Sequence, residues 1–149
     1  MHYVKACNDY ISIDESAEKL INAVNKYYNG DFFGLCEDYF STVSKIKNAD
    51  IIGHIDLITK FNEGGRLFDE TDKRYVNAYK KAVDELIKQD IMFEINTGVI
   101  ARGYKSTPYP SKEILGYIKE KGGKLILSSD CHFKDALMFE FDKYDSYLN

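Results

Sequence analysis

An aspartate and a histidine stand two residues apart at the end of a short apolar run, in the stretch LILSSDCH (residues 125–132). A second histidine, His54, ends a similar run, DIIGH. Imidazole and carboxylate are groups that zinc, manganese and iron use as protein ligands. Because side chains need not alternate in direction beyond a strand's last residue, the Asp130 and His132 side chains can both turn toward one metal cluster. These residue types in this pattern predict a metal site.

The apolar runs that carry these residues are predicted strands, and helical patterns separate them. A strand, helix, strand, helix, strand, helix order from Asp50 onward favours parallel α/β structure with right-handed crossovers. Functional side chains in such folds gather at the carboxyl ends of the strands. We expect strands over residues 50–53, 91–96 and 124–129, and helices over residues 75–86, 111–121 and 133–147.

The segment before Asp50 has a different pattern. Its first ten residues suggest a loop. Apolar positions at helical spacing predict one helix that begins after Ser16 and ends at Asn29-Gly30, and a second helix over residues 32–46. The sequence contains no repeat, linker or low-complexity segment. We therefore expect one domain, or part of one.

Composition excludes several classes of protein. The chain has 149 residues, of which 44% are apolar and 30% charged, which is typical of a globular domain in water. A net charge of −4 argues against a broad nucleic-acid surface. No apolar run approaches the roughly 20 residues that cross a bilayer, and the N-terminus has no signal-peptide layout. Three scattered cysteines form no CxxC pair. A cytoplasmic location is expected.

Four stretches in order resemble the C-terminal half of the histidinol-phosphate phosphatases: DIIGHIDLITKF, FEINTG, PYPSKEIL and GGKLILSSDCH. Those enzymes belong to the polymerase and histidinol phosphatase (PHP) superfamily. The similarity runs from Met1 to about Tyr144. Its most specific part is the spaced set Gly-His-Ile-Asp, Glu-Ile-Asn-Thr and Ser-Asp-x-His, because three motifs in order are far more specific than any one of them.

The resemblance implies a distorted β/α (TIM-like) barrel with two or three divalent metal ions, zinc, manganese or iron, at the carboxyl ends of its strands. These ions activate a water that hydrolyses a phosphate monoester. On the same resemblance, His54 matches a metal-binding histidine, and Asp130 with His132 matches the last ligand pair. His2 matches the histidine of the family's GS-x-H strand end. Asp130 would also orient the attacking water, and His132 would bind metal or protonate the leaving alkoxide.

The loop after the second predicted strand supplies the substrate side of the site. Arg102 resembles a position that the family uses near the substrate phosphate, and a guanidinium binds phosphate oxygens in a bidentate manner. The alternative is a solvated loop arginine. Asn96 and Thr97 are expected to shape the same rim. Glu94 either supports the ligands from behind or is a paired structural carboxylate, and we do not expect it to bind metal.

The chain departs from the family at its N-terminal side. It has no counterpart of the family's His-x-His strand, of a further histidine or of the glutamate that bridges two metals. A complete β/α barrel needs about 250 residues. We therefore expect residues 1–149 to form a single partial PHP domain, an incomplete barrel that lacks the N-terminal strands. Its open edge would expose strands and apolar helix faces, which favours self-association.

The expected function is that of a histidinol-phosphatase, which converts L-histidinol phosphate and water to L-histidinol and phosphate in histidine biosynthesis. The expected partner is a small-molecule phosphate ester, with no nucleic acid and no membrane. Two alternatives remain open. The chain is an inactive fragment or a half-barrel that needs a partner chain, or it is a PHP-type phosphoesterase with another substrate.

Overall fold

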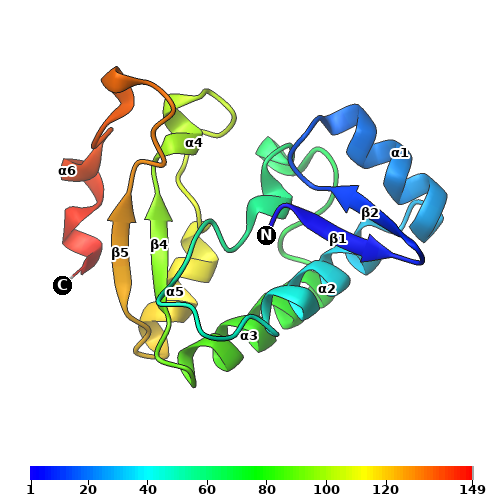
Figure 1. The fold of residues 1–149 in the computed structure, drawn as a ribbon, viewed down its shortest axis with the longest axis horizontal. Coiled ribbons are helices and arrows are strands. Elements are labelled where there is room, and N and C mark those ends of the chain that lie inside the picture. Colours follow the sequence, from blue (N-terminus) through cyan, green and yellow to red (C-terminus); the bar gives the residue numbers. More distant parts are fainter. Residues whose placement is uncertain (149) are drawn as a thin grey trace.

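The computed structural model describes residues 1–148, in which two small sheets lie side by side with helices around them (Figure 1). In chain order, the elements are β1 (Tyr3–Ala6), β2 (Asp9–Ser12), α1 (Ala17–Tyr28), α2 (Phe32–Val43), β3 (Ile51–Ile52), α3 (Lys73–Ile87), β4 (Met92–Asn96), α4 (Gly98–Ala101), α5 (Lys112–Glu120), β5 (Leu125–Ser128) and α6 (Phe141–Tyr144).

The first ten residues form part of a hairpin, so the prediction of a loop there was wrong. Strands β1 and β2 pair antiparallel, with Val4 opposite Ile11. Val4 and Ala6 point into the core whereas Tyr3 and Lys5 are exposed. Each strand has only four residues, and its buried face packs against α1 and α2. So short an alternation carries little local signal, because contacts with distant helices stabilise it.

The first helices follow the predicted pattern closely. The Ser16 hydroxyl accepts a hydrogen bond from the Lys19 N–H, which caps α1, and Asn29 ends the helix in the left-handed region (φ 53°). Helix α2 packs along α3 through aromatic rings, and Phe40 makes edge contacts with Tyr75 and Tyr79. These helices build the core that supports the second sheet.

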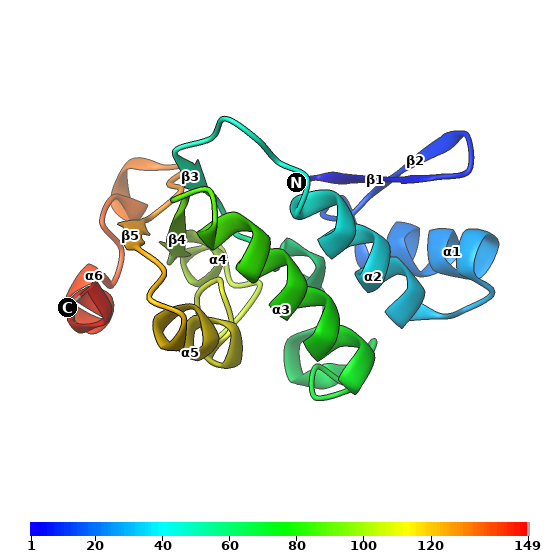
Figure 2. The same cartoon turned by 90° about the horizontal axis from the view of Figure 1, so that it is seen from below.

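Strands β3, β4 and β5 form a parallel sheet in that order, as the alternation of elements predicted. Figures 1 and 2 show α3 and α5 on one side of it. Phe93 and Ile95 on β4 are fully buried toward that side. Side chains of the opposite face are only partly buried, and Ile51 is 43% exposed. All three strands end at the same edge, where the loops carry His54, Thr97 and Asp130.

The C-terminal segment is not the long helix that was predicted over residues 133–147. A 3-10 turn (Lys134–Ala136), the four-residue α6 and a second 3-10 turn (Asp145–Leu148) replace it. Met138 and Glu140 have left-handed backbones (φ 56° and 54°), which a continuous helix cannot contain. Leu137 and Met138 stay largely exposed, at 66% and 62%. The helix fails because this segment buries too little apolar surface to support it.

Helices of the described part are all too short or too polar to traverse a lipid bilayer.

Candidate active site

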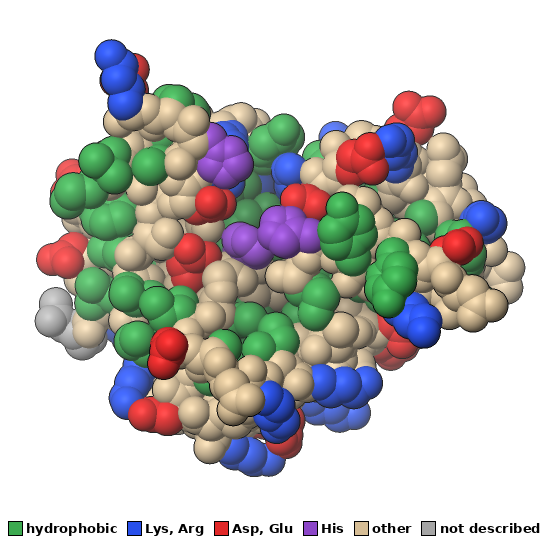
Figure 3. Space-filling view, in the orientation of Figure 1, with side chains coloured by type: hydrophobic (Ala, Val, Ile, Leu, Met, Phe, Trp, Pro, Cys, Tyr) green, Lys and Arg blue, Asp and Glu red, His purple; other side chains and the backbone are tan. Residues whose placement is uncertain are grey.

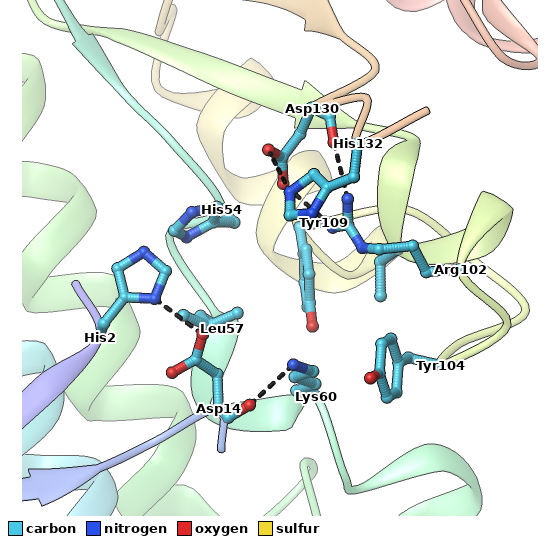
Figure 4. A pocket seen from close by; sticks show the side chains of 11 residues that line it. His2, Asp14, His54, Leu57, Lys60, Arg102, Tyr104, Tyr109, Asp130 and His132 are labelled. Atoms are coloured by element: carbon cyan, nitrogen blue, oxygen red, sulfur yellow. Dashed lines mark hydrogen bonds and ion pairs between the residues drawn. The ribbon is translucent and has the colours of Figure 1, made fainter. Parts of the chain in front are cut away.

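A cavity of about 370 Å³ opens at the carboxyl edge of the parallel sheet, facing the N-terminal hairpin. All three histidines of the sequence, His2, His54 and His132, line it together with Asp130 and Arg102. Figure 3 shows the histidine side chains around this hollow, and Figure 4 shows them directed toward one another. The structure therefore brings together residues from both ends of the chain that the sequence marked as functional.

His54 is held by its backbone as much as by its packing. It follows β3 with a left-handed backbone (φ 31°), a strained conformation that is enriched at functional sites. The Glu94 carboxylate accepts its N–H at 2.7 Å. A side chain at Gly53 would place Cβ 3.1 Å from that same carboxylate oxygen, so the glycine allows the approach. Glu94 therefore supports His54 from behind, one of the two roles predicted for it.

The His54 ring has an unused nitrogen. Its Nδ1 is buried and has no hydrogen-bond partner in the protein. Burial, the largest influence, lowers the pKa of His54 below its ordinary value, which favours the neutral ring. A neutral imidazole with a free lone pair is the form that binds metal ions.

His2 lies beside His54 and is oriented by a carboxylate that the sequence reasoning missed. The two imidazole rings meet edge to face, with centroids 5.1 Å apart. Asp14 places Oδ2 2.8 Å from Nδ1 of His2. Carboxylates that hold one ring nitrogen in this way orient histidines whose other nitrogen binds a metal. Asp14 follows β2, but the first ten residues, which include the start of β2, were predicted as a loop, so no strand end was expected here.

Asp130 is the most densely bonded residue of the site. Its backbone is left-handed (φ 40°). Arg102 donates from Nη1 to the Asp130 carbonyl oxygen at 2.6 Å and from Nη2 to the carboxylate Oδ2 at 3.0 Å. Partial burial alone raises the pKa of Asp130, but hydrogen bonds from Asn96 and Arg102 outweigh burial and lower that pKa overall. The carboxylate is therefore ionised, and its second oxygen, Oδ1, accepts no hydrogen bond from Asn96 or Arg102.

His132 stands at the mouth of the cavity. Its side chain is 65% exposed, and its Nε2 lies 3.5 Å from Asp130 Oδ1. The pair predicted from the sequence motif is thus adjacent in space. Asn96 and Arg102 both contact Oδ2 of Asp130. The other carboxylate oxygen, Oδ1, therefore has no closer partner than the His132 ring, and both residues line the cavity.

Asn96 and Thr97 lie behind this wall and do not line the cavity. Asn96 is fully buried, and its amide group spans Glu94 Oε2 (3.0 Å) and Asp130 Oδ2 (3.3 Å). The Thr97 N–H donates to the Ser128 carbonyl oxygen at 2.9 Å. These contacts join the end of β4 to the loop after β5. Direct contact of either residue with a substrate stays a prediction.

The donor set fits a metal ion in part. Imidazole nitrogens with an ionised carboxylate are suitable donors for zinc, manganese or iron, and the orphaned Nδ1 of His54 is available to bind. Within residues 1–148, however, no three side chains of His, Cys, Asp or Glu converge closely enough to form a ligand cluster by themselves. The residue types fit a divalent metal and supply part of its coordination sphere.

Comparison with known proteins agrees with this geometry. Over 107 residues the chain is 35% identical to a Schizosaccharomyces pombe protein named "Probable histidinol-phosphatase", which is 66% of this chain and 32% of that protein. The chain is thus similar to about a third of a protein of that name. No family model matches it. Histidinol-phosphatases are phosphoric monoester hydrolases, so this relative is named for the activity that the resemblance of the sequence implied.

A solved structure shows the same fold. The crystal structure of the "putative histidinol phosphatase hisK" of Listeria monocytogenes superimposes with a TM-score of 0.78 at 20% identity. The match covers 97% of this chain and 56% of that one. The chain thus spans about a third of the curated histidinol-phosphatase relative and little more than half of the solved structure.

Proposed function

We propose that this chain forms part of a metal-dependent phosphomonoester hydrolase that converts L-histidinol phosphate and water to L-histidinol and phosphate in histidine biosynthesis. The observation that carries the proposal is the convergence of His2, His54, Asp130 and His132 on one cavity at the carboxyl edge of a parallel sheet. The relation to histidinol-phosphatases supports the choice of substrate.

These same four residues are the proposed ligands of divalent zinc, manganese or iron. Such a metal, when bound, would lower the pKa of its water from 15.7 to about 7 and so supply hydroxide at neutral pH. Glu94 and Asn96 hold the His54 backbone and the Asp130 carboxylate in place. The protein's own share of the work is therefore to fix the directions of its donors before substrate arrives.

Proton movements can be assigned to named atoms. Asp130 Oδ1, which Arg102 and Asn96 leave unused, accepts a hydrogen bond from the attacking water and orients it. The water oxygen forms a new bond to phosphorus as the ester P–O bond breaks. In the alternative in which His132 is not a metal ligand, its exposed ring would donate a proton to the leaving alkoxide, and the attacking water would give up one proton to solvent.

The fold of the proposed enzyme is a β/α barrel of which residues 1–149 form one partial domain. Three parallel strands with one incompletely buried face support this, as does the coverage of 56% of the hisK chain. A second candidate function follows from the lack of a three-ligand cluster in residues 1–148. In that case the chain is a half-barrel that becomes active only with a partner chain that completes the ligand set.

The proposal is tested by metal content and turnover of the purified chain. Plasma mass spectrometry should find about one equivalent or more of zinc, manganese or iron, and His54→Ala should lose it while keeping its circular dichroism spectrum. L-histidinol phosphate should be hydrolysed faster than an aryl phosphate. Full turnover by His54→Ala would refute the assignment of this site. Background metal in both proteins would favour the partner-dependent half-barrel.

A further inference from the structure

Asp56 is a carboxylate buried behind the wall of the cavity, and the proposed reaction does not use it. Its side chain has no exposed surface and does not line the cavity. The Ser111 N–H donates to Oδ2 at 2.8 Å. The second oxygen, Oδ1, is also buried and has no hydrogen-bond partner among the described residues. A buried carboxylate is costly unless an opposite charge and further hydrogen bonds compensate for its lost hydration.

Lys105 supplies a buried charge of opposite sign. The residue is only 8% exposed, and its Nζ donates to the Thr59 hydroxyl at 2.9 Å. That hydroxyl donates in turn to the Asp56 carbonyl oxygen at 2.9 Å. Burial raises the pKa of Asp56 to about 6, and the charge of Lys105 is the largest influence that opposes this rise. The two charges therefore interact, but the hydrogen bond of the ammonium group goes to Thr59 and leaves Oδ1 of Asp56 without a donor.

Two tyrosine hydroxyls lie around the same carboxylate. Those of Tyr75, on α3, and Tyr109, before α5, are buried and have no hydrogen-bond partner in the described part of the chain. For both, the charge of Asp56 is the largest influence after burial that raises the pKa. The centroid of the Tyr109 ring lies 5.8 Å from Lys105 Nζ. Buried polar groups are normally paired, and an ordered water with about three hydrogen bonds serves clusters of this kind.

Asp56 also holds the turn that presents His54. The left-handed backbone of His54 (φ 31°) is a strained conformation, which persists only where the surrounding structure fixes it. The Leu57 N–H donates to the His54 carbonyl oxygen at 3.0 Å, so Asp56 is the third residue of a four-residue turn. The Ser111 N–H holds its carboxylate, and the Thr59 N–H holds its carbonyl oxygen at 2.9 Å. Asp56 is therefore well placed to set the direction of His54.

We propose that Asp56 and Lys105 form a buried charge pair bridged by internal water, and that Asp56 is a positioning residue for His54. A water in the bridge donates to Asp56 Oδ1 and accepts from Lys105 Nζ, and its remaining hydrogen bonds go to the buried tyrosine hydroxyls. The pair clamps the turn after β3 against the loop after α4. The link to a metal ligand rests on the proposed function, whereas the water bridge and the hold on the His54 turn do not.

A crystal structure of the wild-type chain tests the bridge directly. We expect an ordered water within about 3.2 Å of both Asp56 Oδ1 and Lys105 Nζ. A direct contact between the two charges, or the lack of any water at Oδ1, would overturn the bridge.

Urea unfolding at a pH well above the pKa of Asp56 tests the pairing. Asp56→Asn and Lys105→Met should each lower the unfolding midpoint, because the other charge then stays buried without its partner. The double variant should lose less than the sum of the two single losses, since it leaves neither charge behind. Simple additivity of the two losses would contradict the pair.

Hydrogen exchange of the His54 N–H tests the positioning role, because this group donates to Glu94 and reports whether the turn stays closed. Asp56→Asn should accelerate its exchange by about tenfold or more, the loss expected when a buried charged contact is broken. The matched control is Val83→Ala, at a buried position of α3 that does not line the cavity. It lowers global stability by leaving a void, and should keep the His54 rate within about twofold of the wild type. Equal acceleration in both variants, or none in Asp56→Asn, would overturn the role; if Asp56→Asn does not fold, the same measurement on Lys105→Met decides.

Failure of the proposed function gives a different result. A chain that shows the water bridge and the faster His54 exchange, but turns over no L-histidinol phosphate in any metal, would leave the buried pair standing and remove the histidinol-phosphatase assignment. If turnover is found, Asp56→Asn should lower kcat more than it raises KM, because it disturbs a proposed metal ligand and no substrate contact. A raised KM with unchanged kcat would overturn the positioning role alone.

Discussion

Gly98 is the tightest point between the two strand ends that carry the site. It begins α4, and a Cβ built on it would lie 2.1 Å from the Ser129 carbonyl oxygen and 3.1 Å from that of Asp130. The same Cβ would lie 3.0 Å from Nη1 of Arg102. Because the nearest obstacle is backbone, Gly98→Ala must push α4 and the loop after β5 apart by about 1 Å. The strain falls on the Arg102–Asp130 contact.

The magnitude of this effect follows from overpacking, which costs about 1–3 kcal/mol in a well-packed region. We expect Gly98→Ala to lower the free energy of unfolding by that amount. A displacement of about 1 Å at Asp130 would also reduce any turnover by about a hundredfold. Urea denaturation followed by circular dichroism measures the first effect, and initial rates with L-histidinol phosphate measure the second.

Gly116 provides the matched control for this substitution. It lies within α5, and a Cβ there would have no neighbour within 4 Å. Gly116→Ala should therefore raise the free energy of unfolding by about 0.5–1 kcal/mol, because alanine loses less backbone entropy in a helix. The reasoning is refuted if Gly98→Ala is as stable as the wild type, or if the two variants shift stability in the same direction.

Two further substitutions test other parts of the structure. Asp14→Asn should weaken metal binding by about ten- to a hundredfold, because His2 loses the carboxylate that orients it; competition with a chromogenic chelator measures this, and the exposed Asp50→Asn should not change it. Arg74 donates hydrogen bonds to the Glu37 carboxylate, and these bonds are the main cause of the lowered pKa of Glu37. The stability that this pair contributes is therefore fully present above the ordinary glutamate pKa and declines as the pH falls through the lowered pKa. Arg74→Met should therefore be less stable than the wild type at pH 7, by a difference that shrinks in acid and in high salt, whereas a difference that grows in acid would contradict the sign.

Much of the parallel sheet and of its site could be predicted because the signals are local. Each strand of the sheet is a short apolar run between helical patterns, and His54, Asp130 and His132 follow the strands directly in sequence. The edge that gathers them is a general property of parallel sheets. The left-handed backbones of His54 and Asp130 add strain that no pattern of residue types reveals.

The remaining features depend on contacts between distant segments. Asp14 acquires its role from its bond to His2 across the hairpin. The helix predicted from residue 111 begins at Lys112, and the Ser111 hydroxyl does not cap it; the Ser111 N–H donates to the buried Asp56 carboxylate. The predicted C-terminal helix is interrupted by the left-handed backbones of Met138 and Glu140, which the residue types of the segment do not reveal.

The position of the cavity in the chain has a consequence for dynamics. His2 precedes β1 and His132 follows β5, so the walls of the cavity come from segments at opposite ends of the described chain. A ligand that contacts both walls acts as a reversible crosslink between the two ends of the chain. Its binding free energy then opposes local opening of the β1–β2 hairpin, which carries one of the two walls. Hydrogen exchange of the β1–β2 amides should therefore slow when metal or phosphate binds, although the ligand touches few of those residues. The hairpin then reports occupancy of the site from outside it.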